Sequence, residues 1–205
     1  IGCLVAGFPR EANNVVEIGG VRTLFRMPDL LSISLGGGTI VNPSTLAVGP
    51  RSVGHHLMEE ALVFGGETLT LTDVAVAAGW ADIGDRNRVR DLSAATVGDV
   101  MAWVERHLSE AVDRMKTSAA GEPLLVVGGG AILIPETIAG VLDIRRIRHH
   151  GVANAVGAAM AQVSGEVDHV FHNMGRDQIL CQAEEMARAR AVAAGAEVET
   201  LKVVD

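Results

Sequence analysis

The chain has 205 residues, of which 48% are hydrophobic, and a formal net charge of −8. This length and composition can bury a core, as one large domain or as two small lobes. The negative charge, without any cluster of Lys and Arg, argues against nucleic acid as a partner. No apolar run approaches the roughly 20 residues of a membrane helix. The two cysteines, Cys3 and Cys181, give no disulfide framework, so we expect a cytoplasmic protein.

The first third of the chain is expected to form short strands. Four runs rich in Val, Ile, Leu and Phe are separated by Gly, Pro and Asn, at residues 1–7, 15–20, 21–27 and 30–35. The first run begins at Ile1 and not at Met, so we expect a fragment of a longer protein. Residues 72–78 predict a helix with Thr72 or Asp73 as N-cap and Gly79 as its stop. Residues 81–94 are polar and predict a loop.

Helices predominate in the rest of the chain. Apolar residues recur at three- and four-residue steps over 96–116, which predicts a long amphipathic helix. Residues 124–127 are continuously aliphatic, as in a parallel strand covered on both faces. We further expect helices over 135–139, 154–162 and 176–194, and strands over 165–171 and 197–204. The alternation predicts an α/β fold, β-rich over about 1–94 and helix-rich over 95–205.

Two glycine triplets lie far apart in the chain, each after an apolar run. Three consecutive glycines weaken a strand or helix, so we do not expect them to serve packing. They offer positive φ angles and a bare main chain that a phosphate or a purine can approach. We therefore expect the two triplets to form two walls of one nucleotide cleft.

Each triplet has an alternative explanation. Gly36-Gly37-Gly38-Thr39 can bind phosphate through its N–H groups and the Thr39 hydroxyl, or can be a hairpin turn between residues 31–35 and 39–41. No lysine follows it, which excludes the P-loop motif. Gly128-Gly129-Gly130-Ala131 lacks the GxGxxG spacing and a later acidic partner. We expect it to pack under an adenine or a ribose, with a plain strand-to-helix turn as the alternative.

Other chemical groups carry weaker signals. Asp73 is the one catalytic candidate, although we favour a helix cap as its role; a cap beside a nucleotide could also orient water or Mg²⁺. Glu17 precedes a glycine pair and is a second carboxylate candidate. The seven histidines show no HExxH spacing and the cysteines no CxxC, so we expect no protein-bound metal site. A GxSxG motif is also absent, which argues against a serine hydrolase.

Several segments together resemble the hydantoinase/oxoprolinase A family. They are VVEIGGVRTLFRMPDLLSISLGGGTIV, LAVGPRSVGHH, GGETLTLTDVAVAAG, LLVVGGGA and GVANAVGAAMAQVSGEVDHVF, in this order over residues 15–171. The resemblance implies an RNase H-like fold of the actin, sugar-kinase and Hsp70 type, closing over ATP and a divalent metal such as Mg²⁺. It implies that Gly36, Gly37, Gly38 and Thr39 form the second phosphate loop. It assigns Gly128, Gly129, Gly130 and Ala131 to the adenosine loop, and Asn154 to a helix near the nucleotide.

The family's first phosphate loop, of the DIGGTTTD type, would precede Ile1, so the fold is expected to be incomplete here. The resemblance implies ATP-dependent hydrolysis of a small cyclic amide such as a hydantoin or 5-oxoproline, by phosphorylation of the amide oxygen. The missing N-terminal lobe, and a second subunit, would supply the rest of the site. The alternative is an ATP-binding regulatory or carboxylase subunit of the same fold with no hydrolase activity. A Rossmann-type oxidoreductase is disfavoured by the missing fingerprint.

Overall fold

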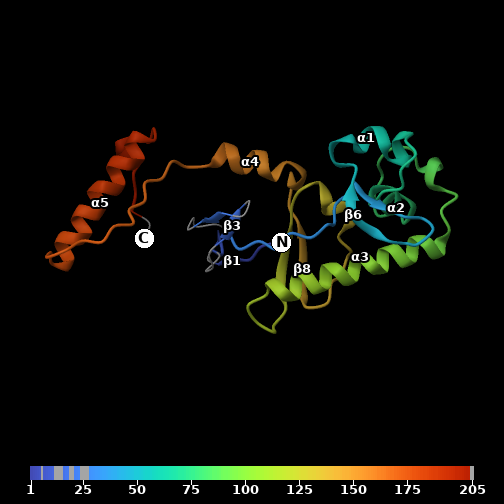
Figure 1. The fold of residues 1–205 in the computed structure, drawn as a ribbon, viewed down its shortest axis with the longest axis horizontal. Coiled ribbons are helices and arrows are strands. Elements are labelled where there is room, and N and C mark those ends of the chain that lie inside the picture. The colour runs from blue at the N-terminus through green and yellow to red at the C-terminus, as the bar shows by residue number, and fades with distance from the viewer. Residues whose placement is uncertain (6, 12–15, 19–20, 24–27, 204–205) are drawn as a thin grey trace. The chain divides into compact units, whose positions relative to one another are not determined.

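The computed structural model describes residues 1–5, 7–11, 16–18, 21–23 and 28–203 (Figure 1). The chain divides into two compact units, Ile1–Ala153 and Asn154–Asp205. Short strands and helices alternate in the first unit, and the described part of the second unit is helical. The chain is therefore an α/β protein built from small sheets and helices. No helix in the described ranges is long and apolar enough to cross a membrane.

The first unit begins with two small antiparallel hairpins. β1 (Leu4–Val5) pairs with β2 (Phe8–Pro9), and β3 (Val16–Ile18) pairs with β4 (Val21–Thr23). The strand expected over 30–35 is not formed, and Leu30 makes only an isolated bridge to Gly2. Isolated hairpins of this length are marginal in water without further contacts.

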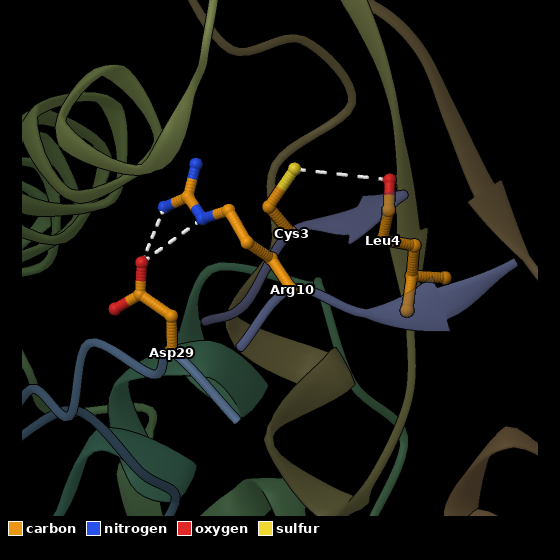
Figure 2. Close-up of polar contacts among 4 residues, drawn as sticks. All are labelled: Cys3, Leu4, Arg10 and Asp29. Carbon is orange, nitrogen blue, oxygen red and sulfur yellow. Dashed lines mark hydrogen bonds and ion pairs between the residues drawn. The ribbon is translucent and has the colours of Figure 1, made fainter. Parts of the chain in front are cut away.

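Polar contacts tie the first hairpin to the segment around Asp29 (Figure 2). The Arg10 guanidinium donates to one carboxylate oxygen of Asp29 from Nε at 2.9 Å and from Nη2 at 2.7 Å. The Asp29 N–H also donates to the Arg10 carbonyl at 2.6 Å, and the Arg10 N–H donates to the Cys3 carbonyl at 2.8 Å. The Cys3 thiol donates only to the neighbouring Leu4 carbonyl, at 3.8 Å. The ion pair and the backbone hydrogen bond between Arg10 and Asp29 thus hold the first hairpin against this segment.

A third hairpin leads into the helices of the first unit. β5 (Thr39–Val41) pairs antiparallel with β6 (Val48–Ser52). The short helix α1 (Leu57–Glu60), flanked by the 3₁₀ turns Gly54–His56 and Leu62–Phe64, connects β6 to α2 (Leu71–Ala77). The Val41 N–H donates to the Leu69 carbonyl at 2.8 Å, which holds the approach to α2 against β5.

The helix α2 begins one residue earlier than expected, and its N-cap is Thr70, not Thr72 or Asp73. Thr70 adopts extended backbone angles and forms a capping box with Asp73. Thr72 and Asp73 lie inside the first turn, and the Asp73 carboxylate closes the capping box by accepting the Thr70 N–H. The helix stops as expected, because Gly79 follows it with a φ of 79°.

The long amphipathic helix is confirmed as α3 (Ala94–Met115), which begins at Ser93 as N-cap. Figure 1 shows it beside α2. Its apolar positions pack with α2, β5 and the segment after the second glycine triplet into one core. The buried members of this core are Val41, Leu69, Leu71, Val74, Ala75, Val100, Met101, Val104, Leu108, Leu133 and Ile138. The loop expected over 81–94 contains one 3₁₀ turn, Arg86–Val89.

The expected strand at 124–127 is β7 (Glu122–Val126), which pairs in parallel with β8 (Val141–Arg146). The sequence did not indicate β8, because its apolar residues are interrupted by Asp143, Arg145 and Arg146. β7 is not covered on both faces as expected, since Leu125 is 46% exposed. The helix expected over 135–139 is absent. Ile134 is extended, as residues before proline prefer, and the turn instead lies earlier, at the 3₁₀ segment η4 (Gly129–Leu133).

The second unit contains α4 (Ala153–Met160), whose first residue closes the first unit, and α5 (Arg176–Ala193). Both helices agree with the sequence prediction within two residues. The strands expected over 165–171 and 197–204 do not form in the described residues, which extend to position 203, and only a 3₁₀ turn at Val198–Thr200 occurs there. β propensity depends on packing against a neighbouring strand. None lies beside these segments in the described part of this unit.

Candidate functional site

The first glycine triplet forms a tight turn at the start of β5. The Thr39 N–H donates to the Gly36 carbonyl at 2.9 Å, and the Gly36 N–H donates to the Thr39 hydroxyl at 3.0 Å. The residues before the turn form no strand, and β5 pairs with β6. The triplet is therefore not the hairpin turn that was the alternative explanation for it.

Gly37 and Gly38 are packed against other parts of the first unit. The Gly37 carbonyl accepts both the N–H of Thr72, at 2.9 Å, and its hydroxyl, at 3.0 Å. A Cβ on Gly37 would lie 2.6 Å from the Thr72 Oγ1, and one on Gly38 would lie 3.0 Å from the Ser52 Oγ. The expectation that the triplet does not serve packing is thus wrong here, since the neighbouring chain leaves little or no room for side chains.

The second triplet is open. Gly128 has a φ of 85°, and its N–H donates to the His150 carbonyl at 2.7 Å. Gly129 and Gly130 then begin η4. A Cβ on any of the three glycines would meet no atom within 4 Å. Packing within the chain therefore does not require glycine at 129 or 130, whereas the positive φ favours it at 128.

The two triplets meet at one pocket of about 420 Å³, which we call the triplet pocket. Gly37 and Gly38 line it from one loop, and Gly129 and Gly130 from the other. The remaining wall consists of Thr72 and apolar side chains, namely Leu57, Met58, Phe64, Ile83 and Ile132. Residues about 90 positions apart thus present bare main chain to a hollow in the size range of small-molecule sites.

Not all the predicted residues reach this pocket. Gly36, Thr39, Gly128 and Ala131 belong to the same two loops but are not among the lining residues. Thr39 is only 4% exposed, and its hydroxyl is used inside the turn. Asn154 belongs to the second compact unit, where it is exposed near the start of α4.

Asp73 is fully buried and does not line the triplet pocket. One carboxylate oxygen accepts the Val63 N–H at 2.8 Å, and the other accepts the N–H and the hydroxyl of Thr70, both at 2.7 Å. Three donors satisfy a buried carboxylate well. This geometry makes Asp73 an anchor that joins the start of α2 to the turn before it. The side chain of Glu17, the other candidate carboxylate, lies outside the described residues.

Thr72 is the pocket residue that sequence reasoning missed. Among the described lining residues, it alone has a polar side chain, and it also binds the Gly37 carbonyl. The alternation of threonines in TLTLTD was visible in the sequence, but only the fold distinguishes Thr72 from the capping residue Thr70.

The triplet pocket carries no ionisable side chain among its described lining residues. The described chain also holds no group of three or more His, Cys, Asp and Glu residues that could bind a metal ion. Protein-bound Mg²⁺ normally uses one or two carboxylates together with substrate phosphates. The residues at this pocket therefore do not form a Mg²⁺ site by themselves.

Comparisons with known proteins agree with the resemblance seen in the sequence. Residues 5–83 match the family described as Hydantoinase/oxoprolinase, which confirms the resemblance to this family. The fold is similar to that of a solved chain titled "Mechanism of ATP-Dependent Acetone Carboxylation, Acetone Carboxylase nucleotide-free structure", with a TM-score of 0.58 and 18% identity. The match covers 89% of this chain but only 31% of the carboxylase chain. No curated protein sequence matches the chain significantly.

Proposed function

We propose that this chain, whose residues 5–83 match the hydantoinase/oxoprolinase family, binds ATP in the triplet pocket and serves the ATP-dependent opening of small cyclic amides. One observation carries the proposal: glycine triplets distant in sequence line one pocket. The matching sequence segment supports the reaction class, and the pocket supports this position for the nucleotide.

The main chain at the pocket suits a phosphate group. Within the described part of the chain, the N–H groups of Gly37 and Gly38 make no hydrogen bond. Consecutive free N–H groups in a turn form an anion-binding nest. The Thr72 hydroxyl lies at the same wall, but it donates its proton to the Gly37 carbonyl. The two free N–H groups would hold the β- and γ-phosphates by directed hydrogen bonds, without help from a lysine.

The opposite wall suits a base and a ribose. Gly129 and Gly130 have open space where a side chain would be, so a flat ring could approach the main chain closely. Ile132 and Phe64 continue this wall with apolar surface. The arrangement supports the assignment of the second triplet to the adenosine side of the nucleotide.

ATP would supply the phosphoryl group that turns a poorly reactive amide oxygen into a phosphate ester. The residues of this chain bind and orient the nucleotide, and the apolar wall limits the access of water. A divalent metal would have to arrive with the phosphates, because the pocket offers it no carboxylate. The groups that act on the amide would come from a second lobe or a partner subunit.

The same observations support an actin-like ATPase fold. The β5–β6 hairpin carries the first triplet at its start, and the second triplet follows the parallel strand β7. In such a fold, a hairpin loop and a loop at a strand end face the nucleotide from two sides. The triplet pocket has this arrangement within the first compact unit.

A second candidate function is the ATP-binding part of a carboxylase, without hydrolase activity. The similarity to a chain titled as an acetone carboxylase favours it. The lack of an ionisable side chain among the described lining residues also fits a subunit that binds nucleotide while others perform the chemistry.

The rate of ADP release separates the two functions. The protein, purified with its native partners, would be assayed with hydantoin and 5-oxoproline, and separately with a small ketone plus bicarbonate. We expect cyclic amides to stimulate ADP release at least ten-fold. Stimulation only by ketone and bicarbonate would establish the carboxylase function, and no stimulation by either would refute both enzymatic proposals.

A further inference from the structure

A second cavity of about 650 Å³ is lined in part by Ala131 and Ile132 of η4 in the first unit, and we call it the Arg146 pocket. Ile132 lines both pockets. The Arg146 pocket is also bordered by Trp80 after α2, Glu105 on α3, and the segment 134–137. The lining residues thus come from four separate parts of the chain. The proposed nucleotide site does not account for the charged and aromatic side chains among them.

The guanidinium of Arg146 is held in place by its own pocket wall. Its Nη2 donates to the Ile134 carbonyl at 2.6 Å and to the Pro135 carbonyl at 3.3 Å. Arg146 makes no ion pair within the described ranges, in contrast to its neighbour Arg145, which binds Asp143 at 2.6 Å. A fixed guanidinium with free N–H groups and no carboxylate partner is suited to a ligand carboxylate.

Negative charge faces the same cavity. Glu105 and Glu136 both line it, and neither forms an ion pair with any described residue. The indole of Trp80 borders the cavity as well, and an aromatic face attracts a cation. The carboxylates and the indole together are suited to an ammonium group, on a ligand whose carboxylate Arg146 binds.

His150 gives an independent sign of an unmet polar requirement. His150 is one of the residues that line the Arg146 pocket, and its buried Nδ1 has no hydrogen-bond partner among the described residues. Buried polar atoms in folded proteins are rarely left so, and an exception calls for a missing ligand or water. The His150 carbonyl also holds the Gly128 N–H, so this residue joins the pocket to the second triplet.

We propose that the Arg146 pocket binds a free amino acid, with its carboxylate on Arg146, its ammonium between Glu105 and Glu136, and its side chain against Trp80 and Ile134. The cavity volume lies within the range of small-molecule sites. A ligand with both charges can pair with Arg146 and with the carboxylates at once, whereas a simple anion or cation can pair with only one of them.

Calorimetric titration with three probes of similar hydrocarbon size tests this proposal without nucleotide. L-Leucine carries both charges, 4-methylpentanoate only the carboxylate, and 3-methylbutylamine only the ammonium. We expect L-leucine to bind at least ten-fold more tightly than either analogue. Equal binding of the three probes, or no binding of L-leucine, overturns the proposal.

Variants locate the binding. We expect Arg146→Gln, and the double variant Glu105→Gln with Glu136→Gln, each to weaken L-leucine binding at least ten-fold. Arg148→Gln and Glu110→Gln change exposed charges outside the pocket and should leave binding unchanged. Because Arg146 also supports the 134–135 segment, the glutamate variant decides the matter if Arg146→Gln fails to fold. Unchanged binding in that variant contradicts the proposal. ATP binding at the triplet pocket is measured separately, so failure of one site does not imply failure of the other.

Discussion

Gly37 and Gly130 each belong to a glycine triplet and both line the triplet pocket, yet their surroundings differ. A Cβ on Gly37 would lie 2.6 Å from the Thr72 Oγ1, so a substitution there disturbs the fold before it disturbs any ligand. Gly130 lines the same pocket but has open space beyond its Cα. A methyl group at Gly130 would therefore meet no other described atom within 4 Å, and we expect it to obstruct a nucleotide in the pocket.

Gly130→Ala should weaken ATP binding at least ten-fold and leave the melting temperature within about 2 °C of wild type, because exposed Gly→Ala changes alter stability by under about 1 kcal/mol. Gly98→Ala is the matched control: Gly98 also has open space around its Cβ, but it lies on α3, outside the pocket and outside both triplets. Calorimetric titration and a thermal melt of both variants give the comparison. Equal ATP affinity in the two variants would contradict the assignment of the second triplet.

Some residues of the pocket could be predicted from the sequence and others could not. The triplets were predictable, because three consecutive glycines are a conspicuous sequence pattern. Thr72 was not identified, since its role depends on the distance between α2 and the first triplet, which are 33 or more residues apart. Thr39 was selected for its position in the sequence, but the turn uses its hydroxyl.

At the element scale, the start of α2 depends on Asp73. Asp73→Asn should lower the free energy of unfolding by about 2–3 kcal/mol, because a buried amide has one acceptor oxygen where three donors now bind a carboxylate. Urea denaturation followed by circular dichroism measures the loss. Asp82→Asn changes an exposed aspartate in the loop after α2 and should cost under about 0.5 kcal/mol. Similar losses in both variants would refute the anchoring role.

The elements that sequence predicted well are those with a local cause. The helix α3 was correct because eight apolar residues follow its period, and α5 because its composition favours helix. The helix expected at 135–139 was wrong, and the described structure has a 3₁₀ segment at Gly129–Leu133 instead. The strands expected at 165–171 and 197–204 do not form in the described residues, because a strand needs a neighbouring strand that the local sequence does not reveal.

At the scale of the whole molecule, stability is concentrated in the first unit. The two clusters of buried apolar residues both lie within Ile1–Ala153, and Ala191 is the one buried hydrophobic residue described in the second unit. A chain ending at Ala153 should therefore keep a cooperative thermal transition within about 5 °C of the full chain. Loss of the transition in differential scanning calorimetry would show that the second unit is needed for folding.

The family resemblance could be predicted from the sequence, because the order of several motifs along the chain is more specific than any one motif. The match over residues 5–83 contains the first triplet and Asp73, whereas the second triplet lies outside it. Only the fold brings the second triplet to the same pocket as the first. No local pattern could indicate this contact, since more than 90 residues separate Gly37 from Gly129.

An NMR titration of the ¹⁵N-labelled chain with ATP tests the central claim most directly. The backbone amide signals of Gly37 and Gly38, and those of Gly129 and Gly130, report on the two loops independently. If one nucleotide bridges the triplet pocket, both pairs of signals should shift along saturation curves with the same dissociation constant. Shifts at one triplet alone, or two curves with different constants, would show that the loops do not bind a common nucleotide.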